Sequence, residues 1–198
     1  MIALLGGANS MSTAGSSGGL KEYGNYLVTI KEENPISPYT TWGYWEMAYQ
    51  DPDSGADYHL HGPGSYWIAG PQTPASEVNN LMATNFSGVY SGGAQGFLSN
   101  TTGQISALTG GATNLTIDFN PGASFPVSGT ISFDQVNLNL MSSTGDVTTN
   151  GFGAQISGAT TSSVQGAFFG PNAAAVGGKF GARMSGGEGY YGIFAGSR

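Results

Sequence analysis

The chain has 198 residues, of which 34 are glycine and only 9% are charged, and its net charge is −7. With five Lys and Arg residues in all, it lacks the clustered cations that nucleic acids and anionic membrane surfaces require. It contains no cysteine, which excludes disulfides, thiolate metal sites and cysteine nucleophiles. No run of apolar residues is long enough for a transmembrane helix.

The first third of the chain predicts a tail followed by a small sheet. Residues 1–20 are rich in Gly, Ser, Ala and Thr, which is typical of a linker or tail. Residues 21–81 form an aromatic-rich section in which we expect a small antiparallel sheet and a short helical linker. Its predicted strands are 23–30, 41–49, 58–61 and 65–69.

The helical linker is predicted between Pro71 and Leu81. Thr73 is expected to cap one or two helical turns, and Pro74 to occupy the first helical position, where its missing N–H costs nothing. This segment marks the predicted boundary before the second domain.

Residues 82–198 predict consecutive strands separated by turn residues. Leu115, Ile117 and Phe119 alternate with polar residues, as on a half-buried strand, and Asp134-Gln135 predicts a turn. The expected strands lie near 83–91, 94–99, 113–119, 127–133, 135–141, 151–158, 163–169, 174–184 and 189–196. Eight or nine such strands, joined by short connections, favour an eight-stranded antiparallel β-barrel, so the predicted fold is all-β.

One stretch, from Gly166 to Phe180, predicts two strands joined by a tight turn at Gly170-Pro171. It resembles the motif Gly-x-Phe-(Tyr/Phe)-Gly-Pro-x-Ala-x-Glu-x-Gly-Gly-x-Phe of the transferrin-binding protein B family of β-barrel domains. The residues in register are Gly166, Phe168, Phe169, Gly170, Pro171, Ala173, Gly177, Gly178 and Phe180, and Ala175 stands at the glutamate position. The ending from Gly192 to Arg198 is similar to the family's Gly-x-Phe-x-Gly-x-Arg.

The resemblance covers residues 82–198 and extends weakly to the aromatic section. That family includes factor H-binding and haemophilin-like surface proteins of Gram-negative bacteria. It therefore implies a cell-surface or secreted binding protein, with a role in nutrient iron acquisition. The matched residues specify the barrel and leave its ligand open, because a fold alone does not transfer a partner.

His59 and His61 are the only histidines, and at alternate positions of an extended segment they point the same way. Imidazole and tyrosine can ligate haem iron, and haemophilin-like relatives bind haem. We therefore name a candidate haem or ligand site at Tyr58, His59, His61, Tyr66 and Trp67. The alternative is that both histidines are ordinary surface residues.

Asp51, Asp53 and Asp57 surround a glycine with the spacing of a calcium-binding loop. Gly62 stands at the twelfth position, where an EF-hand requires glutamate, so the loop is not an EF-hand. Calcium is thus the second candidate ligand, and the alternative is an acidic turn without a metal.

The aromatic residues Trp42, Tyr44 and Trp45 predict a protein interface, since Trp and Tyr dominate interface hot spots. The alternative is that they form the core of the small sheet. Both histidines lie in one short segment, and no nucleophile–base arrangement stands out, so we expect no enzymatic activity. A second hypothesis is a self-assembling surface protein that donates its N-terminal tail as a strand to a neighbouring copy.

Overall fold

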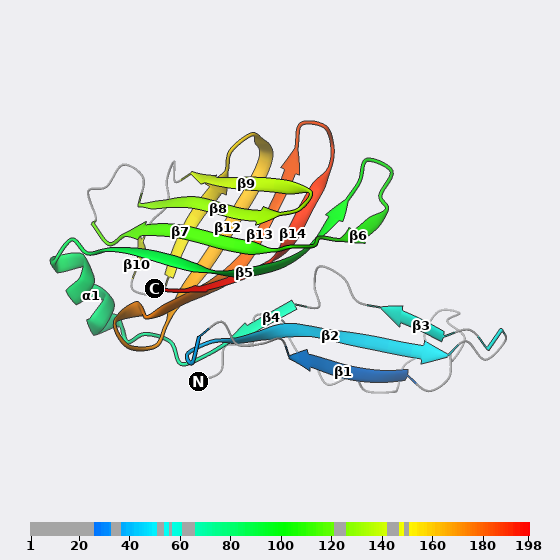
Figure 1. The fold of residues 1–198 in the computed structure, drawn as a ribbon, viewed down its shortest axis with the longest axis horizontal. Helices are drawn as coiled ribbons and strands as arrows, with labels where there is room; N and C mark the ends of the chain where they lie inside the picture. The colour runs from blue at the N-terminus through cyan, green and yellow to red at the C-terminus, as the bar shows by residue number, and fades with distance from the viewer. Residues whose placement is uncertain are drawn as a thin grey trace, which may run out of the picture.

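The computed structural model describes residues 26–32, 37–50, 54–55, 57–60, 66–120, 126–141, 147–148 and 151–198, with the backbone alone for 26–32, 45–50 and 57–60. Two antiparallel sheets make up this part of the chain: a small one formed by the first strands and a larger one that closes into a barrel (Figure 1). The predicted all-β class and the order of the two sheets are confirmed.

The barrel has eight strands, as the spacing of the turn residues predicted. They are β5 (Ser87–Ser99), β7 (Ala112–Asp118), β8 (Val127–Phe133), β9 (Val136–Met141), β11 (Gly151–Ile156), β12 (Ala159–Phe169), β13 (Ala175–Met184) and β14 (Gly189–Ser197). Each pairs with the next along the chain, and β14 pairs with β5. A short contact between β9 and β11 completes the circle, with Gln155 opposite Met141 and Ile156 opposite Leu140.

Two shorter strands extend the barrel wall. β6 (Ile105–Ala107) pairs with the end of β5, and β10 (Val147–Thr148) pairs with the start of β11. Neither was predicted from the sequence, because segments of two or three residues carry no periodic signal.

The barrel interior is filled by side chains at alternate strand positions. Leu115, Ile117 and Phe119 are fully buried, as their alternation with polar residues predicted. Aromatic rings pack through the centre, with 5.0 Å between the ring centroids of Phe119 and Phe168 and 5.5 Å between those of Phe152 and Phe168. The interior is therefore a packed core, as expected for eight strands.

One prediction in the barrel was wrong: the two strands predicted at 83–91 and 94–99 are one strand, β5, which begins at Ser87 after the end of α1. Gly92 and Gly93, which were left between the two predicted strands, lie within the ladders to β7 and β14. Glycine permits close approach of neighbouring strands on a strongly curved wall, and here it serves that purpose without ending the strand.

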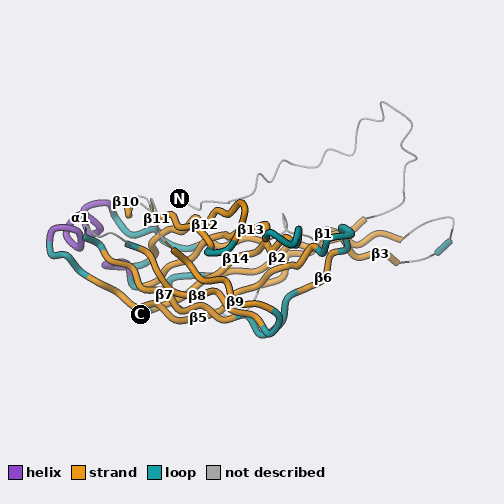
Figure 2. The backbone as a smooth tube through the Cα atoms, turned by 90° about the horizontal axis from the view of Figure 1, so that it is seen from above, coloured by secondary structure: helices purple, strands orange, loops and turns teal. Residues whose placement is uncertain are grey.

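The predicted helix is present as α1 (Ala75–Ala83), at one end of the barrel (Figure 2). Its buried residue Val78 enters the barrel core. The predicted cap was wrong, because Pro74 is the N-cap and no side chain caps the helix. Thr73 instead donates its hydroxyl proton to the carbonyl oxygen of Gly170, 2.7 Å away. No helix in the described ranges has the length and apolar character to cross a membrane.

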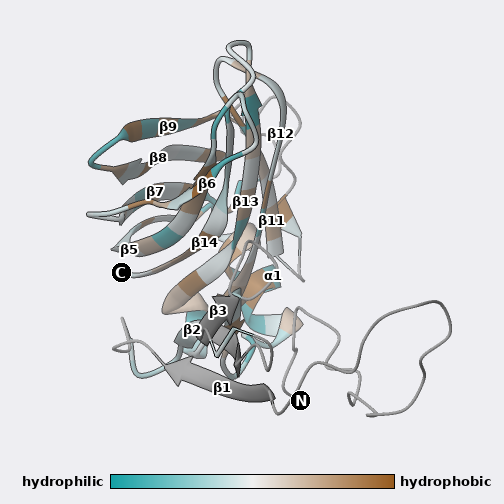
Figure 3. Ribbon diagram, turned by 90° about the vertical axis from the view of Figure 1, so that its right-hand side faces the viewer, coloured by the Kyte–Doolittle hydropathy of each residue, from teal (hydrophilic) through white to brown (hydrophobic). Residues whose placement is uncertain are grey.

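The small sheet is built around one long strand, β2 (Thr41–Gln50). β1 (Tyr26–Glu32) pairs with one edge of β2. β4 (Tyr66–Ala69) and β3 (Asp57–Leu60) follow one another along the other edge, opposite residues 41–44 and 47–50 of β2. Figure 3 shows this sheet as a separate layer against the outside of the barrel wall.

Candidate functional site at the seam between the two sheets

Side chains from both sheets form a small buried cluster where the small sheet meets the barrel, here called the seam. Trp42 of β2 and Ile68 of β4 pack against Ile193 and Ala195 of β14. These four side chains are buried, and Tyr66, which is itself partly buried, packs against them. The small sheet is thus attached to the barrel by apolar contacts that lie outside the barrel's own core.

A glycine on the barrel wall gives Ile68 its place in the seam. Gly177 of β13 lies directly opposite Ala195 of β14. A Cβ added at Gly177 would overlap Cδ1 of Ile68. The absence of a side chain at this family-motif position therefore lets the small sheet approach the barrel wall.

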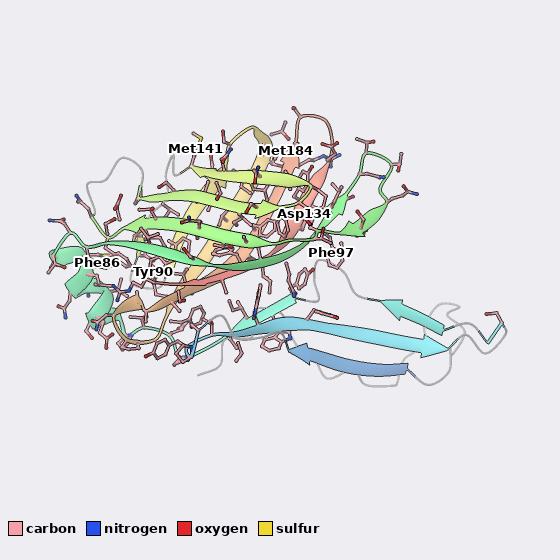
Figure 4. The ribbon with its side chains drawn as sticks, viewed as in Figure 1. Phe86, Tyr90, Phe97, Asp134, Met141 and Met184 are labelled. Carbon is pink, nitrogen blue, oxygen red and sulfur yellow. The ribbon has the colours of Figure 1, made fainter. Side chains whose placement is uncertain are left out.

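Aromatic rings continue the seam along the barrel wall. The rings of Tyr44 and Tyr66 meet edge to face, with 6.4 Å between their centroids. Tyr66 in turn covers Phe97 of β5, with 5.3 Å between the ring centroids. Phe97 lies on the side of the barrel that faces β4 (Figure 4).

The connection from the small sheet to the barrel is secured at the turn after β12, which includes the short helix η1 (Pro171–Ala173). Gly170 has φ 71°, and a Cβ there would overlap the ring of Tyr39. This conformation and this contact explain why glycine is required. Thr73 donates its hydroxyl proton to the Gly170 carbonyl and also donates its backbone N–H to the Phe168 carbonyl, 2.9 Å away. The turn and the connector therefore hold each other.

The same turn is bound from three other parts of the chain. Tyr90 of β5 donates its hydroxyl proton to the Ala173 carbonyl, 2.9 Å away, and burial raises the pKa of Tyr90 to about 12. Glu77 of α1 accepts a hydrogen bond from the Asn172 N–H, while Arg198 donates one to the Asn172 carbonyl. The motif turn thus joins α1, β5 and the end of the chain. Figure 4 shows Tyr90 near this end of the barrel.

The three residues predicted to form a protein interface differ in their positions. Trp42 is buried in the seam, as the alternative of a core residue would require. Tyr44 is half-buried beside Tyr66, next to the barrel wall. Trp45 follows in β2, where the structure describes its backbone alone.

The residues predicted to bind haem are spread along one edge of β2. His59 of β3 lies opposite Ala48, and Tyr66 of β4 lies opposite Tyr44. The two positions are therefore four residues apart along β2, or roughly 13 Å at the usual strand rise. Tyr58 is next to His59 in β3, Trp67 is half-buried in β4, and His61 lies outside the described residues.

The predicted calcium site cannot be placed. Asp51 and Asp53 lie outside the described residues, and Asp57 is the first residue of β3, opposite Gln50. The calcium site stays a prediction of the sequence.

Sequence reasoning missed the barrel residues of the seam. Phe97, Ile193 and Gly177 were assigned to the barrel alone, because strand alternation identifies which residues share a face but not what covers that face.

The seam also holds an unpaired group: Oε1 of Gln95 is buried and has no hydrogen-bond partner among the described residues. Gln95 lies opposite Ile193. The described seam is thus mainly aromatic and apolar, a composition suited to binding.

The comparisons with known proteins agree with this arrangement. The family described as the C-lobe and N-lobe β-barrels of transferrin-binding protein B matches residues 79–198. The chain belongs to this family of β-barrel domains. No curated protein matches it.

Solved structures resemble the small sheet as well as the barrel. Transferrin-binding protein B of Neisseria meningitidis is 19% identical and has a TM-score of 0.58 over 94% of this chain and 37% of its own. A variant of the same protein from Haemophilus parasuis is 18% identical, with a TM-score of 0.56 over 88% of this chain and 37% of its own. A surface lipoprotein is 16% identical, with a TM-score of 0.51 over 89% of this chain and 81% of its own. The chain thus spans 37% of the length of these two transferrin-binding proteins.

Proposed function

We propose that this chain is a ligand-binding lobe of a Gram-negative surface protein and that it captures an iron-carrying host protein. Membership of the transferrin-binding protein B barrel family supports this proposal. The observation that carries it is the extent of the structural likeness, which covers 94% of the chain and so includes the docked small sheet together with the barrel. Such a lobe binds its partner and catalyses no reaction.

The half-buried aromatic side chains of the small sheet are the proposed contact residues. Tyr44, Tyr66 and Trp67 each keep part of their surface accessible. Tyrosine and tryptophan provide large, rigid contact areas, which suits them to protein interfaces. The indole Nε1 atom of Trp67 is buried, so Trp67 offers ring area alone. Their strands are fixed against the barrel, so binding orders few additional groups.

The proposal is tested by biolayer interferometry with the full chain immobilised and purified transferrin as the probe, in its iron-loaded and iron-free forms. Haemoglobin serves as a second iron-carrying probe. We expect saturable binding of one of these proteins, weakened at least about tenfold by a Tyr44→Ala/Trp67→Ala double variant. Val89→Ala, on an exposed part of β5, is the control and should leave binding unchanged. A folded chain that binds neither protein would contradict the proposal.

Haem and calcium remain narrower proposals for the segment before residue 71. Haem binding requires a Soret band on titration that the His59→Ala/His61→Ala double variant loses. Calcium binding requires heat on calorimetric titration that an Asp51→Asn/Asp53→Asn/Asp57→Asn variant no longer gives. A titration without these signals would refute the respective proposal.

The self-assembling alternative is not favoured, since the matching family model and the two matched structures from Neisseria meningitidis and Haemophilus parasuis are of transferrin-binding protein B. It requires oligomers in size-exclusion chromatography that disappear when residues 1–20 are deleted. A monomer unaffected by the deletion would refute it.

A further inference from the structure

A second surface lies beside the seam, on the outer wall of the barrel. The described residues include four large apolar side chains that are exposed: Val89, Ile105, Met141 and Tyr191. Ile105 is 58% exposed and Tyr191 is 37% exposed, and they belong to β6 and β14, the two strands that pair with the end of β5. Phe97 lies between them, directly opposite Tyr191.

Tyr191 has room beside it because its neighbours on the wall are glycines. Gly181 of β13 lies opposite Tyr191, and a Cβ added there would lie 3.3 Å from its Cδ1 atom. A Cβ added at Gly189, two residues earlier in β14, would lie 2.7 Å from its Cε2 atom. The ring therefore lies along the wall beside both glycines, where larger residues would displace it.

Two cationic residues lie on the same face of the barrel wall as Tyr191. Lys179 and Arg183 occupy the positions two residues before and after Gly181, so all three share the outer face of β13. Both side chains are exposed, and neither forms an ion pair with a carboxylate of the described ranges. Their backbone positions are roughly 13 Å apart at the usual strand rise, with Tyr191 between them on the next strand.

This local charge is opposite to that of the whole chain, which has 12 acidic and five basic residues. On the neighbouring strand β12, Thr161 lies opposite Arg183 and Gln165 lies opposite Lys179, with Ser163 between them. These three residues are uncharged, so they do not neutralise the cations from that side. An apolar centre with a cation on either side is complementary to an apolar side chain flanked by carboxylates.

We propose that this surface, formed by Ile105, Lys179, Arg183 and Tyr191, binds an acidic segment of a protein partner that carries an exposed apolar side chain. The surface adjoins the seam, because Phe97, which lies opposite Tyr191, is buried beneath the ring of Tyr66. A partner that contacts the small sheet can therefore reach it. The inference rests on the proposed function and adds to it the chemistry of the partner.

The first test needs no natural partner. An isotope-labelled full chain is titrated with a short synthetic peptide in which tryptophan is flanked by glutamates, and then with the same peptide carrying lysines in their place. We expect NMR shifts of the Lys179, Arg183 and Tyr191 amides with the acidic peptide alone, decreasing as salt is added. Equal shifts with both peptides, shifts confined to other surfaces, or no shifts would overturn the proposal.

Variants test whether these side chains provide the affinity for the acidic peptide. Tyr191→Ala and the double variant Lys179→Gln/Arg183→Gln should each lower that affinity at least about tenfold. Met141→Ala, which removes an exposed apolar side chain elsewhere on the barrel, is the matched control and should have no effect. All of these side chains are exposed, so the variants should fold.

The same variants separate this inference from the proposed function. If transferrin or haemoglobin binds and the Tyr191 and cation variants leave its affinity unchanged, the proposed function holds and this inference is wrong. If the acidic peptide binds here while neither iron-carrying protein binds the chain, the surface is supported and the proposed function is wrong.

Discussion

Ile68 of β4 occupies the space that a side chain at Gly177 of β13 would fill. The contact joins the two sheets across more than a hundred residues of sequence. It gives a physical reason for glycine at a motif position, because a side chain at Gly177 would occupy the space that Ile68 fills. A change at Gly177 should therefore affect how firmly the small sheet is attached, while the core of the barrel stays intact.

Replacing Gly177 by alanine should therefore loosen the small sheet. The added methyl group overlaps Ile68, and overpacking of this kind costs about 1–3 kcal/mol. We expect faster limited proteolysis within residues 37–70 of the Gly177→Ala variant, while the barrel keeps its circular dichroism.

Gly153→Ala provides the matched control for that experiment. A Cβ at Gly153 meets its nearest atom, the Val164 carbonyl oxygen, at 3.8 Å, an ordinary van der Waals contact. The control should be cleaved like the unmodified chain. Equal cleavage of the two variants would show that Ile68 does not need the space at Gly177.

Replacing Thr73 by valine should destabilise the junction between the small sheet and the motif turn. Valine keeps the shape but removes the hydroxyl group that donates to Gly170, and losing a buried hydrogen bond costs about 1 kcal/mol. The measurement is the free energy of unfolding from urea denaturation. Thr73→Ser keeps the hydroxyl group, so its free energy of unfolding should fall less than that of Thr73→Val. If the two variants are equally unstable, the loss comes from packing and not from the hydrogen bond.

The barrel was largely predictable because its signals are local. Alternation placed Leu115 and Ile117 inside, and the Asp134-Gln135 turn and the strands flanking the motif turn followed from their residues. The Gly92-Gly93 error arose because the same glycine pair can end a strand or curve it. Only the neighbouring strands distinguish the two cases.

The seam was not predictable, for a different physical reason. Its contacts join residues far apart in sequence, such as Tyr66 with Phe97 of β5, and strand periodicity does not encode which faces meet. Thr73 shows the same limit. Its type and position suggested a helix cap, but its hydroxyl group donates to a carbonyl 97 residues away.

Replacing Gln95 by methionine should stabilise the protein. The buried Oε1 atom of Gln95 has no hydrogen-bond partner in the described part of the chain, and an unsatisfied buried acceptor costs about 1–3 kcal/mol. Methionine keeps the approximate shape and removes this cost, so the melting temperature should rise. Gln165→Met, at an exposed position of β12, should leave it unchanged. A lower melting temperature for Gln95→Met would indicate that Oε1 has a partner, such as a bound water.

Tyr90 should make the stability of the barrel depend on alkaline pH. Burial raises its pKa in the folded chain to about 12, against an ordinary value of 10. The folded state therefore holds the phenolic proton more tightly than the unfolded state does. This contribution is fully present below pH 10 and is lost as the pH rises through about 12, where the free energy of unfolding should fall by about 2–3 kcal/mol.

The measurement is urea denaturation at several pH values between 9 and 12, with Tyr90→Phe as the comparison. The variant loses the hydrogen bond to the Ala173 carbonyl, so it should be less stable at neutral pH by about 1 kcal/mol. It should also depend less steeply on alkaline pH. Some dependence should remain, because burial and Glu188 also raise the pKa of Tyr190. Parallel pH profiles for the two proteins would show that Tyr90 does not control the alkaline transition.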